Sequence, residues 1–255
     1  MEQRAWSREW NVRGFFITGT DTGVGKTVIT AALIKAVSLL GFKVCGMKPI
    51  ETGCKTTDSR RQSAVSSKKR TLIPSDGMFL KEMAGIDDSI DLVTPIRFES
   101  PLAPLPASGI EGTSVDFEKI QKAYDDLSRN YDVIIVEGIG GLLVPIKRDY
   151  FVLDLARDVG LPILIVARPG LGTLNHTLLT VHYALKEGLT VAGIVINYSY
   201  PPKHTLAEET NPEIIKQISP VPIIGIFPYL KDLKSSTIEK AVVINLDIKT
   251  LKKYL

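Results

Sequence analysis

The sequence is poor in cysteine and histidine, and it contains no long hydrophobic run. Its two cysteines, Cys45 and Cys54, cannot build a disulfide framework or a zinc site, and its three histidines show no metal-binding spacing. No apolar run reaches the roughly 18 residues that a membrane helix requires. Residues 1–13 contain three arginines and two glutamates but no apolar segment, so we expect no secretory signal. We therefore expect a reducing cytoplasmic location and no membrane partner.

Excess basic charge is confined to one segment. The 255 residues carry a formal net charge of +3, and Lys55–Arg70 alone holds six basic residues against one acid, Asp58. This Ser-rich stretch is predicted to be a mobile, solvated insert at 55–73 rather than a nucleic-acid site. We accordingly expect no nucleic-acid partner.

What the chain does contain is a glycine-rich loop, Gly19–Thr27, between a predicted strand and a predicted helix. The apolar run Gly14–Thr18 precedes the loop, and the helical pattern Val28–Leu40 follows it. Backbone N–H groups, the helix dipole and a lysine ammonium then surround one point, which favours a polyphosphate ligand. The Thr27 hydroxyl is placed to ligate Mg²⁺.

This loop departs from the standard phosphate-loop spacing. The standard motif has a glycine five residues before its Gly-Lys pair, where this chain has Thr20, and Gly19 stands one position earlier. A solvated Gly-rich turn would not explain why Gly, Lys and Thr meet where a strand ends and a helix begins. The loop therefore predicts nucleotide binding.

Short β-branched runs alternate with helical patterns along the chain. Several of the runs are nearly all apolar, which indicates strands covered on both faces. We predict an α/β fold with a mainly parallel sheet and helices on both faces, similar to P-loop nucleotide-binding proteins, in a single domain over 14–255. The expected strands are Phe15–Thr18, Val44–Lys48, Asp132–Glu137, Ile163–Ala167, Val191–Asn197 and Ile223–Ile226. The expected helices are Lys26–Leu40, Phe117–Asn130, Asp154–Asp158, Leu174–Glu187 and Pro212–Gln217.

Three further segments have weaker patterns. Residues 1–13 are predicted to be an extension that either packs as a small turn around its two tryptophans or is disordered. The Pro-rich stretch Ile96–Gly112 indicates a loop with a short helix, and Ala241–Ile244 favours an edge strand.

Polar residues stand where two predicted strands end, at the sheet edge that binds ligands in such folds. Lys48 ends the second strand and should point into the same crevice as Lys26, although an ordinary solvated lysine would fit the spacing equally well. Glu137 follows an apolar strand, where phosphate-loop proteins place a Mg²⁺-binding carboxylate. The glycines after it (Gly138, Gly140, Gly141) leave room for a ligand.

The spacing leaves several roles open. A second Mg²⁺-binding acid would be Asp76 or Asp58, and the basic insert between them prevents a choice. Asn175 would cap a helix or contact an anion at its start, and Asn197 would read a nucleotide base. Cys54 has no paired base and is not expected to be a nucleophile.

Together these motifs resemble the dethiobiotin synthetase family of biotin biosynthesis. The resemblance runs from about Phe15 to Leu230. Its pieces are the loop itself, Lys48-Pro49-Ile50-Glu51-Thr52-Gly53, Val136-Glu137-Gly138-Ile139-Gly140-Gly141, Ser100–Pro104, Leu174–Thr180, Asn197 and Pro228–Leu230.

The resemblance implies a set of site roles. Gly23, Val24, Gly25, Lys26, Thr27 and Val28 would cradle the phosphates, and Ile139 belongs to the same nucleotide site. Thr27, Asp76 and Glu137 would hold Mg²⁺, while Lys26 and Lys48 would be catalytic. Asn197, Pro228, Tyr229 and Leu230 would contact adenine. Thr22, Thr52, Gly141 and Asn175 would bind substrate, with Asn175 reaching the active site of the partner subunit in a homodimer.

The implied reaction uses ATP, Mg²⁺ and CO₂ or bicarbonate to close a ureido ring on 7,8-diaminononanoate. Positioning and cationic stabilisation suffice for this chemistry, and it needs no protein nucleophile. Two alternatives remain. A cobyrinate-amidating ligase would carry a glutamine-hydrolysing domain, for which the chain ends too soon. A partitioning-type ATPase switch usually has an extra lysine early in its phosphate loop, and Gly19–Val24 contains none.

Overall fold

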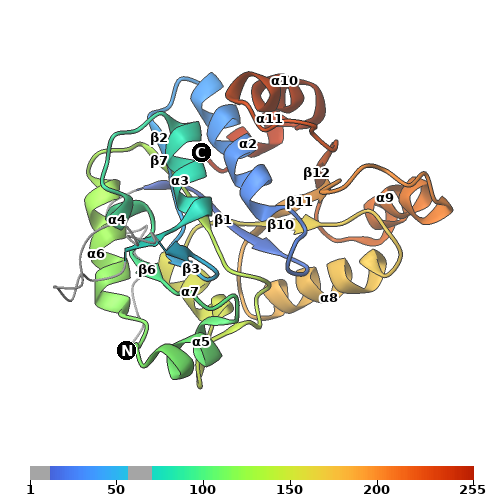
Figure 1. Ribbon diagram of the computed structural model, residues 1–255. Coiled ribbons are helices and arrows are strands. Elements are labelled where there is room, and N and C mark those ends of the chain that lie inside the picture. The colour runs from blue at the N-terminus through green and yellow to red at the C-terminus, as the bar shows by residue number, and fades with distance from the viewer. Residues whose placement is uncertain (1–11, 57–70) are drawn as a thin grey trace, which may run out of the picture.

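The computed structural model describes residues 12–56 and 71–255. A six-stranded sheet with strand order β12-β11-β10-β1-β7-β2 forms its centre, and every neighbouring pair in it is parallel (Figure 1). The expected strands are all present, as β1 (Arg13–Gly19), β2 (Val44–Met47), β7 (Val133–Glu137), β10 (Ile163–Ala167), β11 (Val191–Asn197) and β12 (Ile223–Phe227).

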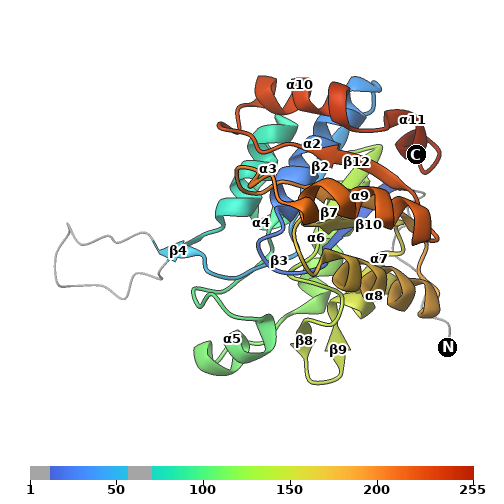
Figure 2. The same cartoon turned by 90° about the vertical axis from the view of Figure 1, so that its right-hand side faces the viewer.

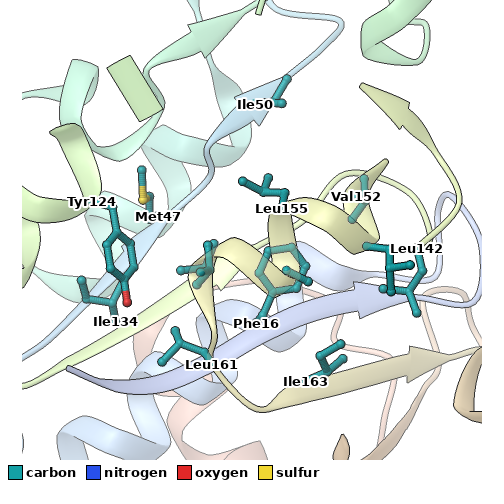
Figure 3. Packing of buried hydrophobic residues seen from close by; sticks show 14 of the residues in the cluster. Phe16, Met47, Ile50, Tyr124, Ile134, Leu142, Val152, Leu155, Leu161 and Ile163 are labelled. Atoms are coloured by element: carbon teal, nitrogen blue, oxygen red, sulfur yellow. The ribbon is translucent and has the colours of Figure 1, made fainter. Parts of the chain in front are cut away.

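Both faces of this sheet are buried, because successive side chains of its strands enter different hydrophobic clusters. Phe16 belongs to one cluster, whereas Phe15 and Ile17 belong to the other. Figure 3 shows part of the first cluster, where Phe16 lies among side chains of the sheet and of the helix that carries Leu155. The prediction of a parallel sheet covered on both faces is therefore confirmed.

Helices cover the two faces in groups (Figures 1 and 2). The face of the Phe15 cluster carries α2 (Lys26–Leu39), α3 (Ser75–Ala84), α10 (Ser235–Asn245) and α11 (Ile248–Lys252). The face of the Phe16 cluster carries α6 (Phe117–Ser128), α7 (Val152–Val159), α8 (Thr173–Lys186) and α9 (Leu206–Ile218). No helix within residues 12–56 and 71–255 is long and apolar enough to cross a bilayer.

Short elements extend the sheet edge where the strands end. They are the parallel pair β3 (Ile50–Glu51) and β6 (Ile96–Arg97), the antiparallel pairs β4 (Lys55–Thr56) with β5 (Leu72–Ile73) and β8 (Pro145–Lys147) with β9 (Tyr150–Phe151), and the helices α4 (Ile90–Val93) and α5 (Pro104–Glu111). Helix α5 is the short helix expected in the Pro-rich stretch, and it packs beside β8 (Figure 2).

The prediction of an edge strand at Ala241–Ile244 is wrong, because these residues lie in α10. Ile238, Ala241 and Val242 are buried, whereas Val243 and Ile244 are 62% and 80% exposed. Burial at positions i, i+3 and i+4 is the spacing of a helix that covers a sheet. The β-branched composition alone had favoured a strand.

Helix α9 begins six residues before the expected start at Pro212. Thr205 and Glu208 form a capping box at its N-terminus, which the sequence analysis overlooked. Pro212 lies inside the helix, where it cannot donate to the carbonyl of Glu208, and the Tyr198 hydroxyl approaches that carbonyl at 3.4 Å instead. The predictions for the N-terminal extension, for most of the basic insert and for Asp58 lie outside the described residues.

Candidate active site

The phosphate loop turns through two glycines in left-handed conformations. Gly23 and Gly25 have φ angles of 76° and 86°. Gly25 is also the N-cap of α2, and as a glycine it has no side chain with which to cap that helix. The first N–H groups of α2 are therefore open toward a ligand, which is the arrangement that binds phosphate at a helix N-terminus.

Lys26 and Lys48 meet in one crevice, as expected. Lys26 is 7% exposed and donates to the backbone carbonyl of Asp21 at 3.1 Å. Burial, reinforced by the nearby Lys48 ammonium, lowers the pKa of Lys26 to about 8. Lys26 is thus a cation without a carboxylate within ion-pair distance among the described residues, and an anionic ligand would satisfy it.

Lys48 lies between two carboxylates. Its Nζ atom is 2.5 Å from Glu137 Oε1 and 3.1 Å from Asp76 Oδ2. Burial by itself would lower the pKa of Lys48, but the two carboxylates outweigh burial and raise this pKa above its usual range. The interpretation of Lys48 as an ordinary solvated lysine is therefore wrong, because its side chain is only 6% exposed.

Glu137 ends β7 and binds two of the predicted residues. Its Oε1 atom accepts hydrogen bonds from the Thr27 hydroxyl at 2.9 Å and from Lys48, while Oε2 is buried and has no hydrogen-bond partner among the described residues. A buried carboxylate oxygen with no donor has room to bind a cation. Of the two acids considered as a second ligand, Asp76 lies in this crevice and its side chain is 42% exposed.

Glu51 was missed as a functional residue, although it lies within the Lys48–Gly53 motif. It is 5% exposed and accepts hydrogen bonds from the backbone N–H groups of Asp76 and Gly77. Glu51 is 25 residues from Asp76 in the sequence, so no local pattern predicted this contact. A glutamate within an otherwise apolar Pro-Ile-Glu stretch was the available clue.

The crevice has a volume of about 300 Å³. Apart from Glu51, every residue that lines it was predicted from the sequence: Thr22, Gly23, Gly25, Lys26, Thr27, Lys48, Thr52, Asp76, Glu137, Ile139 and Gly140. Residues from four separate stretches of the chain thus share one small polar cavity.

Two further cavities adjoin the phosphate loop, and Thr22 lines all three. One of about 420 Å³ includes Gly141, the Leu142–Val144 loop and Leu179 of α8. The other, of about 1020 Å³, lies between the loop, residues 168–171 and residues 198–208. The phosphate crevice is therefore adjoined by one cavity toward α8 and by another toward the start of α9.

The remaining predicted residues lie around these cavities. Asn197 is 1% exposed and donates to the Val24 carbonyl at 2.8 Å, so its amide holds the phosphate loop. Asn175 is exposed in the first turn of α8, whose N-cap is Gly172, so the capping interpretation is wrong.

Five other predicted residues lie outside the crevice lining. Val28 packs against the Phe15 cluster, and Gly138 lies beside the Phe16 ring. Residues 228–230 follow β12 and are not among the residues that line the three cavities.

Comparisons with known proteins give both a family and a fold. A family model described as an AAA domain matches residues 13–237. The ATP-dependent dethiobiotin synthetase BioD of Thermodesulfovibrio yellowstonii is 46% identical, with 93% of this chain and 98% of that protein covered. The proteins of the same name from Aquifex aeolicus and Methanocaldococcus jannaschii are 42% and 37% identical, covering 84% and 86% of this chain and 86% and 95% of their own lengths.

Solved structures with a similar fold have much lower sequence identity. The MinD cell division protein of Aquifex aeolicus superposes with a TM-score of 0.52 at 19% identity, covering 95% of this chain and 96% of its own. A putative plasmid partition protein of Borrelia burgdorferi bound to AMPPNP gives 0.52 at 16% identity, covering 95% and 99%. These likenesses concern the fold alone.

Proposed function

Because this chain belongs to the ATP-dependent dethiobiotin synthetase family, we propose that its phosphate crevice closes the ureido ring of dethiobiotin from 7,8-diaminononanoate, CO₂ and ATP. One observation carries the proposal: Lys26, Lys48, Thr27, Asp76 and Glu137 converge in a cavity of about 300 Å³ beside the phosphate loop. The convergence of two ammonium groups on one phosphate site suits phosphoryl transfer, where negative charge must be held and positioned.

The reaction proceeds through three steps. One amine of the substrate takes up CO₂ and becomes a carbamate, and the carbamate oxygen attacks the γ-phosphorus of ATP while the bond to ADP breaks. The second amine then attacks the carbonyl carbon of the resulting carbamic-phosphoric anhydride, closing the ring and releasing phosphate. The chain contributes position and charge: Lys26 holds the transferring phosphoryl group, and Lys48 faces the carbamate.

The donor set fits a bound Mg²⁺ ion. Mg²⁺ is usually held by one or two carboxylates together with phosphate oxygens and water. Within residues 12–56 and 71–255 Glu137 Oε2 has no hydrogen-bond partner, the Asp76 side chain is 42% exposed, and the Thr27 hydroxyl lies 2.9 Å from Glu137 Oε1. Thr27, Asp76 and Glu137 would hold the ion, which supplies charge neutralisation for the nucleotide phosphates when bound.

The diamine substrate would occupy the crevice next to Thr52 and extend toward Thr22 and Gly141. The cavity of about 420 Å³ continues from there to α8. Two of the leucines that line this cavity are exposed, with Leu143 58% and Leu179 61% exposed. Exposed apolar residues of this kind often mark a subunit interface. A homodimer through α8 would let Asn175 of each subunit meet the carboxylate tail of the substrate bound by the other.

The base of the nucleotide belongs beyond the phosphate loop. The 1020 Å³ cavity begins at residues 22–24 and ends at the β11–α9 connection, so it has room for the ribose. Adenine contacts by Asn197 and residues 228–230 remain predictions, as does a cytoplasmic location. Because the Asn197 amide already binds the loop carbonyl, it would act on the base through its remaining polar atom.

A phosphate-release assay tests the proposed function. Purified protein should release phosphate from ATP and Mg²⁺ when diaminononanoate and bicarbonate are both present, and mass spectrometry should detect dethiobiotin. Omission of either substrate is the control and should abolish both signals. ATP hydrolysis that is indifferent to both substrates would instead favour a nucleotide switch of the partitioning type. Sedimentation velocity measures the dimer separately.

A further inference from the structure

Glu51 is a buried carboxylate for which the proposed reaction has no task. It lies in β3, three residues after Lys48, and is 5% exposed. Its Oε1 atom accepts from the Asp76 N–H at 3.0 Å and its Oε2 atom from the Gly77 N–H at 2.9 Å. Each carboxylate oxygen thus accepts a hydrogen bond from one of two successive backbone amides at the start of α3.

The start of α3 depends on this remote acceptor. Its N-cap is Pro74, which offers no side-chain hydrogen bond to the first turn. The first N–H groups of a helix need an acceptor, and a carboxylate at this end is favoured by the helix dipole. Glu51 supplies that acceptor from a different element, so it connects α3 to the β2–β3 segment that carries Lys48.

This connection determines where the Asp76 carboxylate lies. The Asp76 side chain is 42% exposed, so packing does not hold it, yet its Oδ2 atom is 3.1 Å from Lys48 Nζ. The next residue, Gly77, is pressed against Thr94, whose Oγ1 would be 1.9 Å from an added Cβ. Gly77 packs against Thr94 and Glu51 binds both amides, so the backbone at residue 76 is held from two sides.

We propose that Glu51 is a positioning residue that acts through Asp76. By holding the first turn of α3, it holds the Asp76 carboxylate at the place where Asp76 meets Lys48 and, in the proposed function on which this inference rests, the Mg²⁺ of the nucleotide. Residues that orient a metal ligand typically change metal affinity about 10–100-fold when they are substituted. In Glu51→Gln the side-chain NH₂ group would face one of the two backbone N–H groups, so that contact is lost.

Nucleotide binding tests this role without any turnover. Calorimetry with a non-hydrolysable ATP analogue gives its Kd in Mg²⁺ and in EDTA, and the ratio of the two measures the gain from Mg²⁺. Glu51→Gln should reduce this gain about tenfold, while the Kd in EDTA changes little. Glu111→Gln is the matched control, because Glu111 likewise accepts from two backbone amides, those of Ser100 at 2.8 Å and Glu99 at 3.3 Å, outside the crevice lining. It should keep the full gain.

A double substitution separates positioning from a general effect on the fold. Because Glu51 acts through Asp76, Glu51→Gln should cause no further loss of the Mg²⁺ gain in an Asp76→Asn background. An undiminished gain in Glu51→Gln, or an equal loss in the Asp76→Asn background, would overturn the proposal. Should Glu51→Gln not fold, Glu51→Asp keeps the charge, is too short to reach both amides, and enters the same cycle. Failure of the proposed function would give a different result, because the wild-type protein would then form no dethiobiotin.

Discussion

Lys48 Nζ and Glu137 Oε1 are 2.5 Å apart, and their side chains are 6% and 0% exposed. A buried ion pair contributes little net stability, because desolvation offsets much of the attraction between its charges. The ion pair is better explained by its place in the site than by a contribution to stability. Glu137 keeps the Lys48 ammonium charged and directed at the phosphate crevice. Asp76 and the Thr27 hydroxyl complete the same group of contacts.

Substitution Lys48→Gln should lower kcat by a factor on the order of 10²–10³, the usual effect of removing one group that stabilises transition-state charge. Nucleotide affinity should largely survive, because Lys26 and the loop amides remain. Steady-state phosphate release and calorimetry measure the two effects. Lys147→Gln is the control, since its ammonium lies over the Phe117 ring, 4.4 Å from the centroid, and outside the crevice lining. Near-normal turnover of Lys48→Gln would remove Lys48 from the mechanism.

Substitution Gly25→Ala should weaken nucleotide binding and lower the melting temperature. Gly25 has φ 86°, and an added Cβ would lie 2.1 Å from Asn197 Nδ2, the group that holds the Val24 carbonyl. Backbone strain of this kind costs on the order of 1–3 kcal/mol. Displacement of the Asn197 amide from the Val24 carbonyl would add to this cost. Thermal unfolding and calorimetry would show both losses.

Gly109→Ala is the matched control for this substitution. Gly109 lies inside α5, and an added Cβ would meet no atom within 4 Å. Alanine in a helix interior is expected to leave stability unchanged or to raise it by about 0.4–1 kcal/mol. If Gly25→Ala behaved like Gly109→Ala, the close approach of Asn197 to the loop would be unimportant for binding.

In the protein free of metal and nucleotide, protonation of Lys26 should change the free energy of unfolding. Its pKa is lowered to about 8, first by burial and then by Lys48, from 10.5. Between these two pH values the unfolded chain binds more protons at this lysine than the folded chain does, so the Lys26 contribution to stability rises with pH. Chemical denaturation of the wild type and of Lys26→Met across this window isolates that contribution, and a slope of the opposite sign would contradict the prediction.

Both cysteines should resist thiol reagents in the folded protein. Cys45 and Cys54 are 0% and 3% exposed. Burial raises the pKa of Cys54 to about 12 and that of Cys45 well above its usual value. Because the thiolate is the reactive form, a colorimetric disulfide reagent at neutral pH should react slowly until denaturant is added. Rapid reaction of the folded protein would contradict this prediction.

The central sheet was predictable because apolar residues make up most of each strand. Runs such as Ile163–Ala167 admit few other structures between helical patterns. Shorter or less regular segments were not predictable. The β-branched run at the end of α10 indicated a strand by composition, but it belongs to a helix that packs against α2 and β12. The start of α9 was missed because its capping box was not recognised.

Most residues of the crevice were predictable as candidates, since they follow a strand or lie in the phosphate loop, whereas Glu51 lies within β3 and was missed. The partners of these residues were not predictable. The choice of Asp76, the ion pair of Lys48 with Glu137 and the attachment of α3 to Glu51 join residues 25 to 89 positions apart in the chain. No local pattern records such contacts, because they arise only when the strand ends are brought to one edge of the sheet.

By itself, the sequence determined that this chain forms a parallel α/β sheet, that a loop before α2 binds phosphate, and that lysines and acids lie at the same sheet edge. These features follow from hydrophobic period, glycine position and the residues that end each strand, all of which are local in the sequence. The tertiary structure alone decided which acid faces Lys48, that Asn197 is bound to the loop, and that Glu51 holds the start of α3. Those outcomes depend on burial and on distances between remote segments, which exist only after the chain has folded.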